Sequence, residues 1–379
     1  MVTPTGAPAR MTDRTLSARI RQEWFLGFSV ATGLVFLLTD GAPFGTLAQP
    51  AALSVVFLWL FGTILGSAMS VVRHADHLAA RLGEPYGTLI LTISVTFIEV
   101  VSIAAVMVHG KNSPTLARDT LFAVVMIVLN FMVGLSLLLG GWRHREQSYN
   151  LQGANAYLGV IIPLVVLTLV LPNFTQTTPG PTLSVVQQAF LVVVTIVLYA
   201  TFLVMQTGRH RNYFALRPET SGVTTPGRQP TVLPHAALLI AYMVPVVILA
   251  EQLARPVDYL IGTLHAPVAF GGVIMAVLVA TPEAIGAVRA ATQNDLQRAM
   301  NIFLGSVLST IGLTVPAMIL VSHLIGRDIV IGLQHTDTLM LLLTLAVSVV
   351  TFASGRTNVI QGAVHLTLFA TYLLLIVQG

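Results

Sequence analysis

Two glutamates, Glu99 and Glu283, lie inside long apolar segments of this 379-residue sequence. Each follows a glycine by eleven or twelve residues, Gly87 in one segment and Gly272 in the other. At a rise of about 1.5 Å per helical residue, this spacing places each carboxyl group roughly 18 Å into a bilayer, close to its midplane. A charge at that depth costs on the order of 3 kcal/mol, so we expect a function that compensates for the cost.

Exchange of protons for a cation is the chemistry that suits such a pair. A carboxyl group removed from water favours its protonated form, and two facing carboxyl groups strengthen that preference. A divalent cation matches two carboxylates in charge and in hardness. Because the same oxygens cannot hold both, we expect Glu99 and Glu283 to bind the cation and protons alternately. The structural alternative for Glu99 is a protonated side chain that ties two helices together.

Residues around the two glutamates offer further oxygens. Pro282 removes a helical N–H and frees the carbonyl one turn back, so we predict a helix break there and at the glycines 87 and 272. Back-bonding to the helix, or close helix packing, is the alternative for the small polar residues. The candidate members of a coordination shell are Ser94, Thr96, Asn130, Thr281, Ser306 and Ser309.

Other ionisable residues lie near the ends of apolar segments. We expect Asp76 and His77 to form a solvated helix end, with a cytoplasmic proton relay as the alternative. Five histidines are predicted to be interfacial polar groups: His109, His265, His323, His335 and His365.

Composition and periodicity indicate that the chain is a membrane protein. Hydrophobic residues make up 55% of the sequence and charged residues 9%, whereas about a quarter of a soluble domain is charged. We predict an all-α polytopic membrane protein with about eleven transmembrane helices. Their expected ranges are 24–39, 52–72, 87–108, 120–140, 156–171, 184–206, 235–252, 264–288, 300–325, 338–353 and 358–377.

Several function classes are disfavoured by the sequence. It contains no cysteine, which excludes disulfides, thiolate metal sites and cysteine nucleophiles. No arginine cluster with interleaved aromatic residues indicates nucleic-acid binding, and no H-E-x-x-H or G-x-S-x-G motif indicates an intramembrane enzyme. We therefore expect no enzymatic activity and no cofactor apart from the transported cations and protons.

Positive charges predict the orientation. With the N-terminus inside, 15 of the 19 lysines and arginines lie on the cytoplasmic side. This distribution predicts a protein of the cytoplasmic (inner) membrane with its N-terminus inside and its C-terminus outside. The lipid bilayer, metal cations and protons are the expected partners, and the oligomeric state is left open. The first apolar segment is expected to be a retained helix rather than a cleaved signal peptide.

Two regions share a pattern of glycine, lone glutamate and Leu-x-Arg, and the predicted topology gives them opposite orientations. Such an inverted repeat is typical of secondary transporters. The predicted organisation is a cytoplasmic N-terminal segment (1–23), a first helix (24–39), one five-helix repeat (52–206), a cytoplasmic linker (207–234) and a second repeat (235–377).

The stretches "EPYGTLILTISVTFIEV" and "GGVIMAVLVATPEAIGAV" resemble the two alpha-repeats of calcium/proton antiporters of the ChaA type. This type lies in the CAX group of the calcium–cation antiporter superfamily. The resemblance implies an extra first helix before two inverted five-helix repeats, whose glutamates carry Ca²⁺, with Na⁺ or K⁺ as further cargo, in exchange for H⁺. The alternatives are a monovalent Na⁺(K⁺)/H⁺ antiporter and an uncoupled cation channel. Val95–Thr96 and Val279–Ala280 replace the Gly-Asn that usually precedes each glutamate in the wider CAX group.

Overall fold

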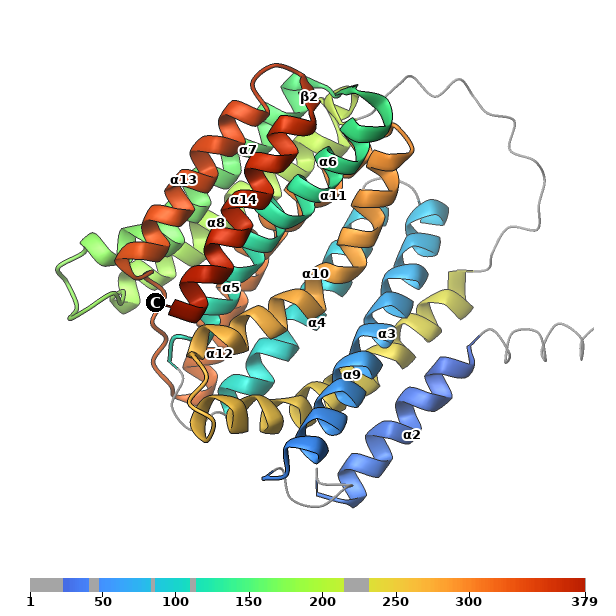
Figure 1. Ribbon diagram of the computed structural model, residues 1–379, viewed down its shortest axis with the longest axis vertical. Coiled ribbons are helices and arrows are strands. Elements are labelled where there is room, and N and C mark those ends of the chain that lie inside the picture. Colours follow the sequence, from blue (N-terminus) through green and yellow to red (C-terminus); the bar gives the residue numbers. More distant parts are fainter. Residues whose placement is uncertain (1–22, 41–47, 83–85, 110–113, 215–231, 379) are drawn as a thin grey trace, which may run out of the picture.

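The computed structural model describes residues 23–40, 48–82, 86–109, 114–214 and 232–378 (Figure 1). Eleven helical rods cross the described part of the chain, and eight of them are long and apolar enough to span a membrane. Three further apolar helices are shorter. The prediction of an all-α polytopic membrane protein with about eleven helices is therefore confirmed. Residues 1–22 of the predicted N-terminal segment and 215–231 of the predicted linker lie outside the described residues.

The first half of the chain contains six rods. Four of them are single α-helices: α2 (Trp24–Leu38), α3 (Pro50–Leu82), α4 (Tyr86–His109) and α8 (Val185–Thr207). The other two rods change helix type along their length. These are α5 (Leu116–Met126) with η1 (Ile127–Met132) and α6 (Val133–His144), and α7 (Leu151–Val165) with η2 (Val166–Val170) and η3 (Leu171–Phe174).

The second half contains five rods and is preceded by a short 3₁₀ turn, η4 (Arg211–Tyr213). Four rods are single helices: α9 (Val232–Gly262), α10 (Val268–Thr292), α13 (His335–Thr351) and α14 (Val359–Gln378). The remaining rod consists of α11 (Leu296–Ser309), η5 (Thr310–Thr314) and α12 (Val315–Ile325).

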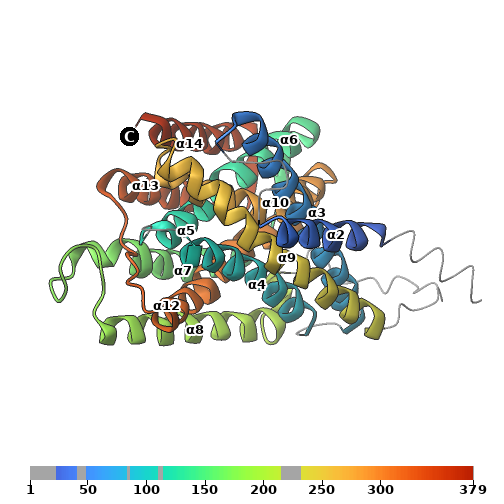
Figure 2. The same ribbon diagram turned by 90° about the horizontal axis from the view of Figure 1, so that it is seen from below.

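The helices that carry the glutamates lie between two groups of rods. Helices α2, α3 and α9 pack together on one side, and α3 and α9 both contact α4 and α10 (Figure 1). On the other side α10 packs against α5 and α6, and α14 packs against α6. Seen from below, α14 and α8 lie at opposite edges of the molecule, with α10 and α4 between them (Figure 2). Glu99 and Glu283 are thus carried at the centre of the molecule.

The arrangement of α4 and α10 supports the predicted inverted repeat. The two helices run in opposite directions, since α4 starts at the end of the molecule where α10 finishes (Figure 1). The rod that follows each of them changes to a π-helix near its middle, η1 in the first half and η5 in the second. The predicted repeat ranges 52–206 and 235–377 take in α3–α8 and α9–α14 respectively.

The helix breaks predicted at Gly272 and Pro282 are wrong, because α10 is continuous from Val268 to Thr292. Proline removes one backbone donor from the helix, which takes only the Leu278 carbonyl's helical partner away, and the other hydrogen bonds of α10 keep the helix continuous. Gly87 lies in the first turn of α4 and does not interrupt it either. The irregular backbone lies instead in the π-helical segments, which often occur at functional sites.

A short β-ribbon joins two loops at one end of the bundle. Strands β1 (Glu146–Ser148) and β2 (Arg356–Asn358) pair antiparallel, with Gln147 opposite Thr357. The Gln147 amide is buried and donates to the Ala291 carbonyl in the last turn of α10. The ribbon therefore links the α6–α7 and α13–α14 loops and holds the end of the helix that carries Glu283.

Close packing of α10 on α5 explains the glycine at position 272. A Cβ atom there would lie 2.6 Å from the backbone carbon of Asp119 and 2.8 Å from the nitrogen of Thr120. We expect Gly272→Ala to lower the free energy of unfolding by about 1–3 kcal/mol, because backbone atoms cannot move aside as a flexible side chain does. Thermal unfolding of the detergent-solubilised protein measures the effect.

Gly62→Ala in α3 is the matched control for this substitution, since nothing lies within 4 Å of its added Cβ. Alanine also favours a helix interior by about 1 kcal/mol over glycine, so this variant should melt at the wild-type temperature or above it. Equal melting temperatures for the two variants would contradict the packing argument.

Candidate cation and proton site

Glu99 is enclosed by protein. It lies on α4 and is only 1% exposed. Its Oε2 atom accepts hydrogen bonds from Thr314 Oγ1 at 2.6 Å and from Thr310 Oγ1 at 3.2 Å. Its Oε1 atom is buried and has no hydrogen-bond partner among the described residues. Because most buried polar atoms have a partner, this oxygen is available to hold a proton or to bind a cation.

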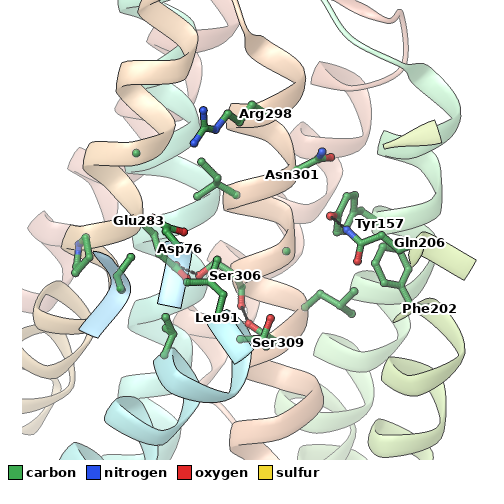
Figure 3. A pocket seen from close by; sticks show the side chains of 18 of the residues that line it. Asp76, Leu91, Tyr157, Phe202, Gln206, Glu283, Arg298, Asn301, Ser306 and Ser309 are labelled. Atoms are coloured by element: carbon green, nitrogen blue, oxygen red, sulfur yellow. Dashed lines mark hydrogen bonds between the residues drawn. The ribbon is translucent and has the colours of Figure 1, made fainter. Parts of the chain in front are cut away.

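Glu283 lies on α10 and lines a cavity of about 430 Å³ (Figure 3). Its Oε2 atom accepts a hydrogen bond from the Ser306 hydroxyl on α11. Ser306, which contacts Glu283, and Thr310, which contacts Glu99, lie four residues apart on one rod, although the two glutamates are 184 positions apart in the sequence. The structure therefore brings the two predicted glutamates together, one sealed in protein and the other facing a cavity.

Hydroxyl groups from a single rod donate hydrogen bonds to both carboxyl groups. Ser306, Thr310 and Thr314 follow one another at intervals of four residues, on α11 and η5. A π-helix has more residues per turn than an α-helix, so the change of helix type keeps the threonine hydroxyls near one face of the rod. This row of hydroxyls, which we call the hydroxyl row, contacts Glu283 at one end and Glu99 at the other.

The corresponding rod of the first half has a different role. Asn130 occupies η1 and, counted from Arg118 and Arg298, corresponds to Thr310. Its amide donates to Thr344 Oγ1 at 2.9 Å, and its carbonyl oxygen lies 3.3 Å from His365 Nδ1. Asn130 therefore joins α13 and α14 to the bundle, and its described hydrogen bonds include none to either glutamate.

The other predicted ligands occupy varied positions. The Ser94 hydroxyl is buried and donates to the Ile90 carbonyl, and Thr281 makes the same kind of back-bond to its own helix. Thr96 is half-buried and is not among the residues that line the cavity. Ser309 lines the cavity, but its hydroxyl donates to the Ser306 carbonyl. Of the six candidates, only Ser306 has a described hydrogen bond to a glutamate.

The cavity reaches Glu283 from the end of the bundle that carries Asp76 and Arg298. These two side chains come from different groups of helices, α3 and α11, and both line the cavity (Figure 3). The polar residues Gln206, Asn301 and Ser309 also line it. Glu99 is not part of the lining. Access from this end therefore stops at Glu283.

Thr310 and Thr314 were not predicted from the sequence as partners of Glu99. Their spacing of four residues in "STIGLT" places both hydroxyls on one helical face, which is a usable signal. The prediction for His365 as an interfacial group is wrong. Its side chain is fully buried, and Nε2 lies 2.9 Å from Thr351 Oγ1. The described neighbours of His365 are polar groups of α13 and of η1. The position of a histidine within its own apolar segment does not show which other helices it contacts.

Comparison with known families assigns the chain. The profile described as "Sodium/calcium exchanger protein" matches residues 52–208 and 234–378, which together include both glutamate helices. The chain belongs to the sodium/calcium exchanger protein family. The resemblance to calcium–cation antiporters stated from the sequence is thereby confirmed, and the protein is a multi-pass membrane protein of a transporter family.

Curated relatives of this exchanger-family protein cover most of its length. The "Putative ionic transporter y4hA" of Sinorhizobium fredii is 42% identical over 87% of the chain and 91% of the relative. The "Sodium-potassium/proton antiporter ChaA" of Escherichia coli is 41% identical over 86% and 90%. The "Ca(2+)/H(+) antiporter ChaA" of Bacillus subtilis is 21% identical over 89% and 96%.

Solved structures show that this fold has been observed before. The structure of native YfkE matches with a TM-score of 0.71 at 18% identity, covering 93% of this chain and 98% of that one. The H⁺/Ca²⁺ exchanger CAX matches with a TM-score of 0.63 at 13% identity, covering 93% and 88%. At these identities the likeness concerns the fold.

Proposed function

We propose that the protein is a proton-driven antiporter that exports Ca²⁺ in exchange for H⁺. The observation that carries the proposal is the paired arrangement of Glu99 and Glu283. A single row of hydroxyls contacts both glutamates, and of the two only Glu283 lines the cavity. Relatives whose names state cation/proton antiport support this activity.

The donor set suits a hard cation. Ca²⁺ takes about 6–8 oxygen ligands at 2.3–2.6 Å. Two carboxylates offer up to four oxygens, and each hydroxyl of the hydroxyl row keeps lone pairs with which it can accept as well as donate. When the carboxyl groups are protonated they lose the negative charge that holds the cation. Binding of protons and binding of Ca²⁺ therefore exclude one another, and this exclusion couples the two fluxes.

Alternating access follows from the two groups of rods. Helices α3 and α9 contact both glutamate helices. On the other side of the molecule, the β-ribbon joins the α6–α7 loop to the α13–α14 loop. We infer that α2, α3 and α9 move against the remaining helices and so expose the glutamate pair to each side in turn. With the orientation predicted from the positive charges, the cavity opens to the cytoplasm.

Orientation and location follow the charge distribution. We place the N-terminus in the cytoplasm, the C-terminus outside, and the protein in the cytoplasmic membrane, because 15 of 19 basic residues then face inward.

A monovalent cargo is the second candidate. The relative from Escherichia coli, at 41% identity, carries Na⁺ and K⁺ in its name, whereas the relative named for Ca²⁺ is 21% identical. The same carboxylate chemistry applies to Na⁺ or K⁺, with less charge to balance. The cavity among the described residues ends before Glu99, and this favours an exchanger over an uncoupled channel.

Everted membrane vesicles that hold a pH gradient test the proposed function. Addition of Ca²⁺ should dissipate the gradient in vesicles with the protein and not in vesicles without it. Na⁺ and K⁺ are added separately to establish the cargo. Dissipation by Na⁺ or K⁺ alone would replace the Ca²⁺ proposal by the monovalent one, and dissipation without any added cation would contradict antiport.

Ser306→Ala should weaken apparent cation affinity about tenfold, because it removes a hydrogen bond to a carboxylate that is worth roughly 1.5 kcal/mol. Ser309→Ala is the matched control, since Ser309 lines the same cavity but donates to a backbone carbonyl. The concentration of cation that gives half-maximal dissipation is measured for both. Equal values for the two variants would remove Ser306 from the site.

A further inference from the structure

Three buried oxygens without a described hydrogen-bond partner lie on α4 and α9, two helices that pack against each other. They are Glu99 Oε1, Ser102 Oγ and Gln252 Oε1. Glu99 and Ser102 are each 1% exposed, and Gln252 is 4% exposed. Leaving a buried polar atom unpaired is costly, so such atoms are few in folded proteins. The exchange of protons for a cation accounts for Glu99 but not for Ser102 or Gln252.

Gln252 offers a second oxygen besides its side-chain amide. In an α-helix the carbonyl of residue 252 accepts its hydrogen bond from the N–H of residue 256. Residue 256 is a proline inside α9 and has no N–H to donate. The Gln252 carbonyl has therefore lost its helical partner. Backbone carbonyls and glutamine side-chain carbonyls are both among the ligands that Ca²⁺ takes in proteins.

The depth of Gln252 in the bundle follows from the contact of α9 with α10. Both α4 and α9 finish at the end of the molecule where α10 begins, which we call the far end; the cavity opens at the opposite end (Figure 1). A Cβ atom added to Gly271, near the start of α10, would lie 3.4 Å from Val257 Cγ1 of α9. Gln252 precedes Val257 by five residues, so it lies about 7–8 Å from the level of Gly271 toward the cavity end.

Glu99 lies at the same depth. Glu283 follows Gly271 by twelve residues and is therefore about 18 Å from that level. The hydroxyl row contacts Glu283 at its first residue and Glu99 at its second and third, which lie about 6 and 12 Å nearer the far end. The Glu99 carboxyl group is thus about 6–12 Å from the level of Gly271, a range that includes Gln252.

Ser102 extends the polar groups toward the far end. It follows Glu99 by three residues on α4, so the two side chains lie on the same face of the helix, about 4.5 Å apart along its axis. The residues of α4 that follow, from Ile103 to Val108, are all apolar. The described cavity reaches Glu283 from the other direction and is not lined by Glu99, Ser102 or Gln252. Polar groups therefore continue past the glutamate pair by about one helical turn.

We propose that Gln252 and Ser102 form, together with Glu99, a second cation position through which the transported cation leaves the glutamate pair toward the far end. The inference rests on the proposed function for the identity of the cargo. One carboxylate and neutral oxygens hold a cation less tightly than two carboxylates do, and this difference favours release. Gln252 belongs to α9, one of the helices inferred to move, so opening of the far end changes the oxygens around Glu99.

Cation affinity measured separately at the two faces tests this position. With the predicted orientation, everted vesicles expose the cavity face and right-side-out vesicles expose the far face. The Ca²⁺ concentration that gives half-maximal exchange is measured in both. Gln252→Leu should raise it about tenfold at the far face and less than about twofold at the cavity face, because a ligand of the far position is lost. An equal change at both faces, a change at the cavity face alone, or no change would overturn the proposal.

Gln188→Leu is the matched control, since Gln188 Oε1 is also buried without a described partner but lies in the first turn of α8. Both of its half-maximal concentrations should stay within about twofold of wild type. Thermal melting separates a cation ligand from a packing residue. Gln252→Leu should melt at or above the wild-type temperature, because leucine removes an unpaired buried oxygen. A lower melting temperature with unchanged affinities would assign Gln252 to structure and overturn the proposal.

A labelling experiment tests the position without transport and uses the absence of cysteine from the sequence. Gln252→Cys places a thiol at the proposed position, and Ala250→Cys places one at another buried position of α9. Reaction with methyl methanethiosulfonate is followed in detergent with and without saturating Ca²⁺, and separately with Na⁺. Bound cation should slow labelling of Gln252→Cys about threefold relative to Ala250→Cys. Equal rates with and without cation would overturn the position even if exchange is confirmed. Protection of Gln252→Cys in a protein that does not exchange would support the position and contradict only the proposed function.

Discussion

Replacing Glu283 with glutamine is expected to lower Ca²⁺/H⁺ exchange by about 100-fold or more. The substitution removes one of the two negative charges that hold the cation. Breaking such an arrangement costs about 3–5 kcal/mol, and each 1.4 kcal/mol is a factor of ten in affinity. Glutamine has nearly the same shape and still accepts a hydrogen bond from Ser306, so the fold should persist. Rates of gradient dissipation in everted vesicles measure the loss.

Glu146→Gln supplies the matched control. It makes the same chemical change at a carboxylate whose side chain is 64% exposed, in the β-ribbon, where its nearest described cation lies 3.9 Å away. Exchange by this variant should stay within about twofold of wild type, since exposed ion pairs contribute little. If Glu283→Gln exchanged Ca²⁺ for protons at the rate of Glu146→Gln, Glu283 would not be a transport ligand.

Glu99→Gln is expected to abolish net exchange as well, but with a different residual activity. Glu283 still faces the cavity in this variant, so Ca²⁺ should reach it and bind about 100-fold more weakly. A neutral amide is buried at less cost than a carboxylate, and its oxygen accepts from Thr310 and Thr314 as the carboxylate did. The variant should therefore melt at or above the wild-type temperature. Binding is followed by ⁴⁵Ca²⁺ retention, and unfolding by thermal melting in detergent.

The two readouts separate a transport role from a structural one. A glutamate that only ties helices together would give a less stable protein that still exchanges, which is the alternative stated from the sequence. Loss of exchange together with preserved melting supports the site. Preserved exchange together with a lowered melting temperature would assign Glu99 to structure.

The sequence predicted the helices well because length and polarity determine them. A segment of about 20 apolar residues has few alternatives to a membrane helix, and the positive residues between segments limit how the segments alternate. The position of each glutamate within its segment was likewise readable, since the helical rise converts residue number into depth. Length, polarity and depth are properties of a single segment and do not depend on which helices contact one another.

The coordination shell was harder to predict because it depends on which helices meet. Thr310 and Thr314 reach Glu99 across 211 and 215 positions of sequence. Asn130 has the chemistry of a ligand and a matching place in its repeat, yet packing directs it to Thr344 and His365. The predicted break at Pro282 is wrong for a local reason. The loss of one backbone hydrogen bond at proline does not by itself interrupt a helix that is packed against its neighbours.

The central claim is that the same carboxyl groups hold protons or the cation, never both. Proton release on cation binding tests it most directly: Ca²⁺ is added to the purified protein in weakly buffered detergent solution, and the change in pH is recorded. The account predicts that wild type releases protons as it binds ⁴⁵Ca²⁺, that Glu99→Gln or Glu283→Gln releases fewer, and that the double variant releases none. Tight Ca²⁺ binding without proton release from the wild-type protein would contradict it.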